Sequence, residues 1–508
     1  MQIVLKTLLA CSALFVASCG QSGPVQSHES ERPHIVILLA DDLGIDVAPC
    51  HSQTVRMPFL ESLCDRSVVL ERAYTHPVCT PSRATLMTSR HPYEHGANNV
   101  AQSARKLALE ETTLAERFKA LDSEPYSTAG FGKWHLSDDE NGGLDSPNLQ
   151  GFDFFEGTPR QHQTYAFWDF DWWRNGELIE ESVPTYRTTF IVDRVLDYFK
   201  ASQDQGPQFI YVGFTNPHLP FHLPPAELHA YEEMPPPPKR GPLKQPAQPG
   251  FYQANRRDAR LDPYFFAMLE SLDHEIQRLV VELQRESDRP ILFLFAGDNG
   301  TSPEVYQGDT SAGYRAKGTL YEGGAAVPIQ IWESGNELGL EYARSAKLFH
   351  FADIGPTLLS FAGATREQTD AFERETSGIA LADAVRGGHQ EHHDLIYLER
   401  GTINGAPFAF GSVDQEGFKL IVWEKEEVVF PAIEGFFPSQ IEFYDIKNDP
   451  GEVTNLFETC EANFSLVQRH FDFIQRELGK ARGSDVPFDS STLRTKISAQ
   501  SDFCTQHR

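Results

Sequence analysis

The sequence is short of positive charge. Lysine and arginine number 44 against 72 aspartates and glutamates, which gives the 508-residue chain a formal net charge of −28. A surface this acidic repels nucleic acid, so we expect no nucleic-acid partner. It also repels anionic ligands at long range, so any anion site must be a local cluster of basic side chains. Methionine is scarce as well, with 5 residues against 36 phenylalanines, which indicates a core built on aromatic rings.

Long apolar runs are missing beyond the N-terminus, so no later segment is expected to span a membrane. A short basic start, residues 1–6, precedes an apolar run at 7–17 that ends in Val-Ala-Ser-Cys19. Small residues before a cleavage point are typical of an export signal. A cysteine directly after them resembles the lipobox of bacterial lipoproteins. The resemblance implies a signal peptide over 1–18, a lipid anchor on Cys19 and a tether over 19–32. The alternative is a plain signal peptide.

If this resemblance holds, the chain is an exported lipoprotein anchored in the outer membrane. We expect the periplasmic side, with the cell surface as the alternative. Cysteine is sparse, and Cys50, Cys64, Cys460 and Cys504 would remain for disulfides in an oxidising compartment. Cys460 with Cys504 could fasten the C-terminus, but spacing alone leaves the pairing open.

Unbroken apolar runs at 34–39, 208–214 and 291–295 are typical of strands buried on both faces of a parallel sheet. Between them, residues 264–283 place apolar side chains at spacings of three and four, which predicts a long helix with one apolar face. Alternating strands and helices indicate an α/β sandwich. We place it at 33–385, followed by a smaller α+β domain at 386–508, where short strands and turns take over.

Polar residues follow three of the buried runs. Asp41-Asp42 follow the first, Asn216-Pro217-His218 the second and Asp298-Asn299 the third. In open α/β sheets, ligands gather at the carboxyl ends of the strands. Four oxygen-bearing side chains that meet there suit calcium or magnesium rather than zinc.

A further motif, Cys79-Thr80-Pro81-Ser82-Arg83, includes a proline where a helix could begin. Cys79 would then lie at the helix N-terminus, which favours anions, with Arg83 one turn inside. On physical grounds alone this position predicts a cysteine thiolate of low pKa.

Cys-x-Pro-Ser-Arg followed by Ala-x-Leu-x-Thr-x-Arg resembles the signature of the type I formylglycine sulfatases. The resemblance continues along the chain in the family's order. It is carried by Asp41-Asp42-Leu43-Gly44, Gly132-Lys133-Trp134-His135-Leu136, Asn216-Pro217-His218-Leu219-Pro220, Gly297-Asp298-Asn299-Gly300, Lys317-Gly318 with Tyr321-Glu322-Gly323-Gly324, and Tyr444-Asp445 through Asn455-Leu456. Ser89 departs from the pattern, because it stands where the family usually has glycine.

The resemblance implies an alkaline-phosphatase-like sandwich with a central, mostly parallel sheet flanked by helices. It implies that Cys79 is converted to 3-oxoalanine (formylglycine) by a formylglycine-generating or anaerobic sulfatase-maturating enzyme. One Ca²⁺ per chain would be held by Asp41, Asp42, Asp298, Asn299 and the modified Cys79.

The resemblance also assigns catalytic roles. Arg83 and Lys133 would hold the formylglycine hydrate, which acts as nucleophile and forms a covalent sulfate intermediate. His135 would be the base that resolves this intermediate. Lys133, His218 and Lys317 would grip the sulfate and support the leaving oxygen.

The reaction implied is hydrolysis of sulfate esters on carbohydrates, with fragments of algal polysaccharides such as ulvan or carrageenan as the expected substrates. The aromatic run 165–174 is either the core of an inserted hairpin or a sugar-stacking surface, and His162, Trp168, Trp172 and Trp173 are candidate sugar contacts. Two alternatives remain, a phosphate or phosphonate ester hydrolase of the same superfamily and a catalytically dead glycan-binding lipoprotein.

Overall fold

The computed structural model describes residues 32–100, 106–122, 124–160, 166–231, 258–311, 314–388, 392–401, 407–423, 440–480 and 490–507. The signal peptide, Cys19 and His162 lie outside these residues. From Arg32 onward the chain forms one compact unit. Among the described residues, we find no helix that combines the length and the apolar character needed to cross a membrane.

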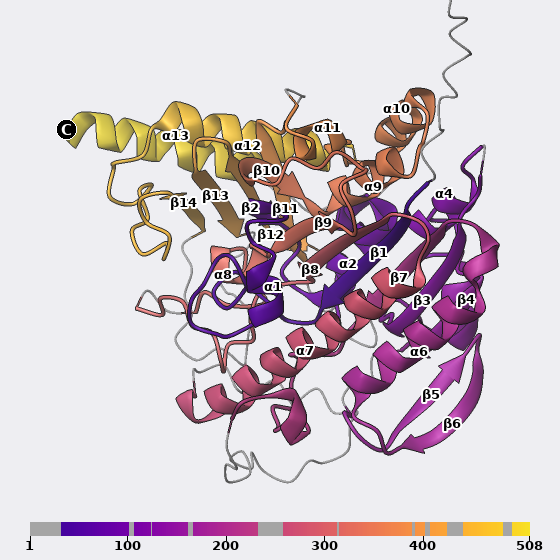
Figure 1. Ribbon diagram of the computed structural model, residues 1–508. Coiled ribbons are helices and arrows are strands. Elements are labelled where there is room, and N and C mark those ends of the chain that lie inside the picture. Colours follow the sequence, from indigo (N-terminus) through magenta and orange to yellow (C-terminus); the bar gives the residue numbers. More distant parts are fainter. Residues whose placement is uncertain are drawn as a thin grey trace, which may run out of the picture. The chain divides into compact units, whose positions relative to one another are not determined.

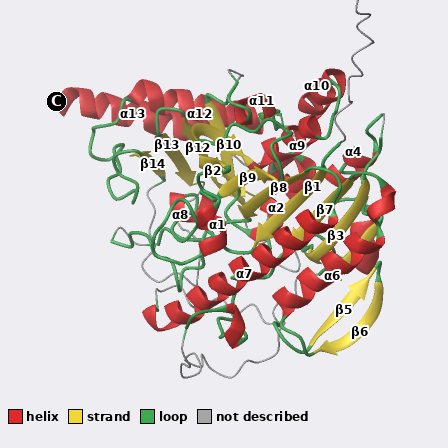
Figure 2. Ribbon diagram, viewed as in Figure 1, coloured by secondary structure: helices red, strands yellow, loops and turns green. Residues whose placement is uncertain are grey.

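A ten-stranded mixed sheet forms the centre of this unit (Figures 1 and 2). Strands β8, β1, β7, β3 and β4 run parallel to one another, whereas β9 is antiparallel to both β2 and β8. In spatial order the strands are β10 (Arg344–His350), β2 (Val68–Tyr74), β9 (Ile329–Glu333), β8 (Ile291–Gly297), β1 (His34–Ala40), β7 (Gln208–Gly213), β3 (Ser127–Lys133), β4 (Phe154–Thr158), β5 (Phe170–Arg174) and β6 (Glu177–Val183).

Strand β1 shows why its run is apolar throughout. Val36 and Leu38 belong to the core on one face of the sheet, and Ile35 and Ile37 to the core on the other. Successive side chains of a strand point to opposite faces, so a strand covered on both sides needs no polar positions.

Helices cover both faces, with α6 and α7 crossing the face nearest the viewer (Figure 1). Their core includes α1 (Pro58–Ser62), α6 (Arg187–Ala201) and α7 (Asp262–Glu286). The opposite core includes α2 (Cys79–Thr88), α4 (Leu114–Lys119), α9 (Ile354–Phe361), α10 (Arg366–Glu375) and α11 (Ala382–Val385). Three further helices are short: α3 (Pro92–His95), α5 (Ser146–Leu149) and α8 (Glu322–Ala325). The predicted long helix is therefore confirmed as α7.

A four-stranded antiparallel sheet follows in the C-terminal part, with α12 and α13 on one face (Figure 1). Its elements are β11 (Leu395–Gly401), β12 (Pro407–Asp414), β13 (Phe418–Trp423), β14 (Ile441–Asp445), α12 (Phe464–Leu478) and α13 (Ser490–His507). Its other face packs on Tyr74, Leu320 and Tyr321 of the larger part. The predicted α/β sandwich with a smaller α+β unit is confirmed, while the domain limits 33–385 and 386–508 stay a prediction.

The cysteines left open by the sequence pair as Cys50–Cys64 and Cys460–Cys504. The second disulfide joins α13 to the loop before α12, so the C-terminal helix is fastened as expected. Ser89 ends α2 with φ 56°, a left-handed conformation that glycine adopts more readily. The change from glycine to serine therefore costs local backbone strain and leaves the helix intact.

Candidate active site

Two neighbouring parallel strands bring the acidic motifs together. β1 ends at Ala40 and β8 at Gly297, and these two residues are paired in register. Asp41-Asp42 and Asp298-Asn299 therefore leave the sheet side by side, and the Asp42 amide donates to Asp298 Oδ1 at 3.0 Å. The sequence prediction that these side chains meet is confirmed.

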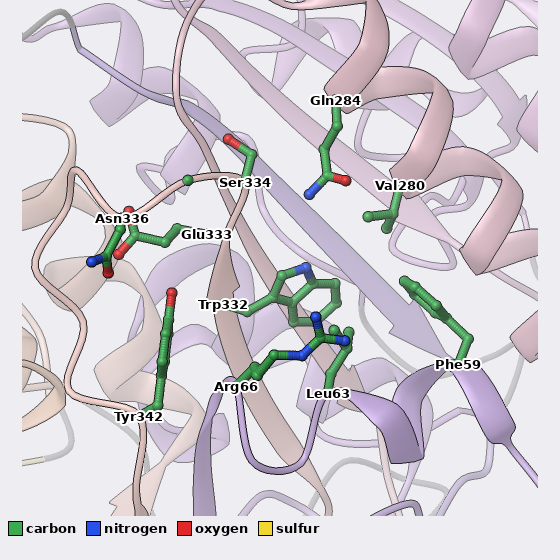
Figure 3. A pocket seen from close by; sticks show the side chains of 11 residues that line it. Phe59, Leu63, Arg66, Val280, Gln284, Trp332, Glu333, Ser334, Asn336 and Tyr342 are labelled. Carbon is green, nitrogen blue, oxygen red and sulfur yellow. The ribbon is translucent and has the colours of Figure 1, made fainter.

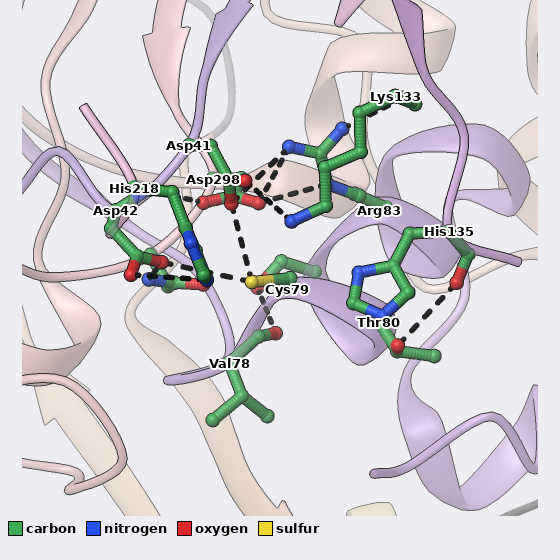
Figure 4. Close-up of polar contacts among 12 residues, drawn as sticks. Asp41, Asp42, Val78, Cys79, Thr80, Arg83, Lys133, His135, His218 and Asp298 are labelled. Carbon is green, nitrogen blue, oxygen red and sulfur yellow. Dashed lines mark hydrogen bonds and ion pairs between the residues drawn. The ribbon is translucent and has the colours of Figure 1, made fainter. Parts of the chain in front are cut away.

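Cys79 is the first residue of α2 and lies directly against this acidic group (Figure 4). Its Sγ is 3.3 Å from Asp41 Oδ1 and 3.4 Å from Lys317 Nζ. Candidate ligand atoms of Asp41, Asp42, Cys79 and Asp298 all lie within 4.8 Å of one another, and all four side chains are buried. Such a cluster could hold a metal ion.

Three basic side chains neutralise the carboxylates. Arg83, one turn into α2, donates from Nε to Asp298 Oδ2 at 2.8 Å. Lys133 at the end of β3 donates to Asp41 Oδ2 at 2.5 Å, and Lys317 donates to Asp42. This is the local basic cluster that an anion site requires in so acidic a chain.

Two histidines border the same space. Both ring nitrogens of His135 are buried without a hydrogen-bond partner, and its ring lies beside Thr80 and Cys79 (Figure 4). His218 Nδ1 donates to the Leu219 carbonyl oxygen at 2.6 Å, and its Nε2 lies 3.7 Å from Asp42 Oδ2. The structure therefore brings Arg83, Lys133, Lys317 and His218 to the carboxylates of the acidic cluster.

Burial and these ion pairs set the pKa values of the site residues. Burial alone would raise the pKa of Asp41, but Lys133, His218 and Arg83 outweigh it and hold that pKa well below its usual range. Burial and the Asp41 carboxylate raise the pKa of Asp298 to about 6. Burial, followed by the charges of Lys133 and Lys106, holds the pKa of His135 well below its usual value. His135 is therefore neutral and able to accept a proton.

The prediction of a thiolate of low pKa at Cys79 is wrong. Burial raises the pKa of the Cys79 thiol well above its usual value, and the Asp298 carboxylate raises it further. The helix N-terminus and the two lysines do not offset these effects. Unmodified Cys79 is therefore a protonated thiol and a poor nucleophile.

Backbone strain is concentrated at the site. Asp42 has φ 66° and His135 has φ 67°, in the left-handed region that residues other than glycine seldom adopt. Such conformations cost on the order of 1 kcal/mol or more each, and they persist where the surroundings impose them. Both residues carry side chains into the pocket.

The donor set fits a hard cation. Asn299 Nδ2 donates to Asp42 Oδ1 at 2.9 Å, whereas Asn299 Oδ1 is buried without a hydrogen-bond partner. An orphaned amide oxygen beside three carboxylates is the type of ligand that calcium or magnesium takes.

Two residues that hydrogen-bond to site residues were not predicted from the sequence. Tyr211 on β7 accepts a 2.7 Å hydrogen bond from Arg83 and donates to the Lys133 carbonyl at 3.0 Å. Ser302 donates to Asp42 Oδ2 at 3.0 Å. Tyr211 lies inside an apolar strand, so its sequence neighbourhood carries no sign of this role. Ser302, three residues after Asn299, could have been suspected from proximity alone.

The aromatic run forms the inner face of a hairpin, as one of the two interpretations predicted. Trp172 on β5 is fully buried and donates from Nε1 to Glu156 at 3.1 Å, so it cannot stack on a sugar. Trp173 is half-buried on the same strand. Trp168 is half-buried against Tyr186 and His222. The expectation of a sugar contact at Trp172 is therefore wrong.

A cavity of about 570 Å³ lies elsewhere (Figure 3). Among its lining residues are Trp332 and Glu333 on β9, which pair with Phe293 and Leu292 at the beginning of β8. The acidic motifs follow the C-terminal end of β8. The cavity therefore lies at the other end of this strand, and none of the site residues line it.

Comparison with known proteins agrees with this arrangement. The profile of the Sulfatase family matches residues 33–364, more than half of the chain. The arylsulfatase of Clostridium perfringens is 23% identical over 88% of this chain and 94% of its own. Arylsulfatase G of Rattus norvegicus is 25% identical over 76% of this chain and 75% of its own.

Solved structures share the fold. The crystal structure of Ps i-CgsB superposes with a TM-score of 0.67 at 19% identity, over 92% of this chain and 98% of that one. The strand ends, the cysteine-bearing helix and the family profile agree, so this chain belongs to the sulfatase family and is a sulfuric ester hydrolase.

Proposed function

We propose that the chain hydrolyses sulfate esters on carbohydrates, with residue 79 in the formylglycine form. The observation that carries the proposal is the grouping of Arg83, Lys133 and Lys317 around buried Cys79 in a strongly acidic protein. A sulfate monoester is an anion, and the charge that shifts during its cleavage needs fixed cations.

The formylglycine form accounts for the state of Cys79. A buried thiol of raised pKa has little nucleophilic character, and the surroundings of Cys79 offer no hydrogen-bonded histidine to activate it. The hydrated aldehyde supplies a hydroxyl nucleophile when present. Arg83 and Lys133 orient that group, and neutral His135 takes up a proton.

Lys317 and His218 complete the set of side chains that we propose to bind the ester. Lys317 Nζ lies between Asp42 and Cys79, where it can pair with a sulfate oxygen. His218 Nε2 faces the same space. Because Nδ1 already donates to the Leu219 carbonyl, Nε2 can give a proton to the leaving oxygen only from the imidazolium form, which burial disfavours and the Asp42 and Asp41 carboxylates favour. We propose that a formylglycine-generating or anaerobic sulfatase-maturating enzyme is an essential partner, because it would convert Cys79.

We propose Ca²⁺ as the bound cation, held by Asp41, Asp42, Asp298, Asn299 and residue 79. The ligands are all hard oxygens of irregular arrangement, which calcium tolerates better than magnesium. The cation would neutralise carboxylates and polarise a sulfate oxygen.

Removal of the metal is therefore expected to abolish activity. A chelator should lower kcat/KM on an aryl sulfate by on the order of 10²-fold or more. Calcium should restore the rate more fully than magnesium. Both ions are assayed with the same stripped enzyme, and its secondary structure is checked by circular dichroism. Full activity after verified removal of all divalent ions would contradict the metal assignment.

The carbohydrate substrate is supported by the solved relatives. Ps i-CgsB has been solved in complex with k-i-k-neocarrahexaose, and BT4656 in complex with its substrate D-glucosamine-2-N,6-O-disulfate. We favour sulfated algal oligosaccharides, in keeping with the proposed export of this chain as a lipoprotein anchored through Cys19 to the outer membrane.

The main rival is a phosphate or phosphonate ester hydrolase on the same fold. A phosphate monoester carries up to one more negative charge than a sulfate monoester, and three carboxylates in the pocket disfavour it. We expect kcat/KM on 4-nitrophenyl sulfate to exceed that on 4-nitrophenyl phosphate by at least about 10²-fold, roughly 2.7 kcal/mol. A ratio near or below unity would favour the phosphatase.

A glycan-binding protein with a dead site would turn over neither ester. Peptide mass spectrometry of protein from the native host distinguishes this case. Complete retention of the Cys79 thiol would support the dead site and contradict our proposal.

A further inference from the structure

Three histidines form a second cluster of potential metal ligands. His76, His91 and His350 are all buried, and one ring nitrogen of each lies within 4.8 Å of those of the other two. None of them belongs to the acidic cluster around Cys79. Their function is not explained by the proposed hydrolysis.

The three side chains come from segments that surround helix α2. His76 lies three residues before Cys79, where α2 begins. His91 follows the end of α2 and caps α3, and His350 is the last residue of β10. A ligand shared by them would connect both ends of α2 to the sheet.

The spacing of the rings is compatible with a tetrahedral site. Two nitrogens bound to one zinc at about 2.0–2.1 Å are roughly 3.4 Å apart at the tetrahedral angle. His91 Nδ1 and His76 Nε2 are 3.5 Å apart. The ring centroids are 5.6, 5.2 and 4.8 Å apart, so all three rings surround one small space.

The outer nitrogens are oriented by the main chain. His76 Nδ1 lies 3.3 Å from both the Glu399 carbonyl oxygen and the Glu399 amide nitrogen, and the tautomer that donates to the carbonyl leaves a lone pair on Nε2. Metal-binding histidines are commonly oriented by such a bond. His350 Nε2 is buried without a hydrogen-bond partner.

Binding at His350 has one cost. Its Nδ1 accepts a 3.2 Å hydrogen bond from the Ala352 amide, so in the metal-free form the ring proton is on Nε2. On metal binding that proton moves to Nδ1 and the ring stays neutral. The Ala352 hydrogen bond is then lost.

Protons do not occupy the ligand nitrogens of the cluster. Burial lowers the pKa of His76 to about 3 and those of His91 and His350 well below the usual value, so protons do not compete for the lone pairs. The buried Glu399 carboxyl, on the residue that orients His76, has Oε1 without a hydrogen-bond partner. Burial raises the pKa of Glu399 to about 8, so this carboxyl is neutral near pH 7 and becomes a counter-charge only when it loses its proton.

We propose that His76, His91 and His350 bind a divalent transition-metal ion, with Zn²⁺ the best fit. Imidazole ligands suit zinc, whereas the all-oxygen active site suits calcium, so the two sites select different ions. Three protein ligands leave a fourth position for a small molecule such as water. The metal would brace α2 and so stabilise the position of residue 79.

The test uses the full chain, stripped of metal and reloaded with excess Ca²⁺ to fill the acidic site. Titration with Co²⁺ should give the intense visible absorption of tetrahedral coordination. Loading with Zn²⁺ should leave one tightly held zinc per chain by elemental analysis and raise the thermal midpoint by several degrees.

The variants His91→Gln and His350→Gln should lose the cobalt spectrum, the zinc and the rise in midpoint. His51→Gln, which alters another histidine of lowered pKa outside the cluster, should retain all three. If the cluster variants fail to fold, the wild-type spectrum decides the question. Absence of tetrahedral cobalt absorption in the wild type, or unchanged zinc content in folded variants, would overturn the proposal. None of these measurements depends on sulfatase turnover.

Discussion

Cys79→Ala is expected to lower kcat on 4-nitrophenyl sulfate by on the order of 10⁴-fold or more, because it removes the side chain that is proposed to become the nucleophile. The sulfur contacts Asp41 and Lys317 but is no part of the hydrophobic packing under α2. We therefore expect the thermal midpoint to change little. Stopped assays at high enzyme concentration measure the residual rate.

Binding should survive the substitution, since Arg83, Lys133 and Lys317 remain. A sulfated substrate should still protect the Cys79→Ala variant against thermal unfolding. If this variant keeps near-full activity, the nucleophile is elsewhere and the assignment of residue 79 is refuted.

His135→Ala is expected to lower kcat by about 10²- to 10⁴-fold, the usual contribution of a positioned base. The ring nitrogens of His135 have no hydrogen-bond partner within the described structure, so removing the side chain breaks no hydrogen bond. His51→Ala serves as the matched control, because His51 is another histidine of lowered pKa and lies outside the site.

The pH profile adds a second readout for His135. Burial and neighbouring cations lower its pKa, so the base stays unprotonated below the ordinary histidine value of about 6.5. The acid limb of the wild-type profile should therefore lie below that pH, and the variant should lose this limb. An unchanged profile and rate in His135→Ala would show that another group is the base.

The site could be predicted largely because it is built from strand ends. Asp41-Asp42 and Asp298-Asn299 follow apolar runs, and parallel strands bring such ends to one edge of a sheet. The local basic cluster followed from charge alone, since an anion site in this chain needs one. The motif order then identified which lysines belonged to it.

Other features depend on packing that the sequence does not specify. The thiol of Cys79 lies at a helix N-terminus, yet burial and Asp298 decide its pKa. Strand β9 reverses direction within an otherwise regular α/β pattern. The histidine cluster joins His76 and His91, 15 positions apart, to the distant His350, and this spacing matches no recognisable motif.

The hairpin at the edge of the large sheet has a consequence for how copies of this protein meet. Strand β6 is the last strand of the sheet, and all but its final residue are exposed. An uncovered strand offers its backbone for pairing with another molecule. Glu177, Glu180 and Glu181 line it, and their mutual repulsion between molecules opposes edge-to-edge aggregation. Replacing these glutamates with neutral residues would weaken that protection and favour self-association.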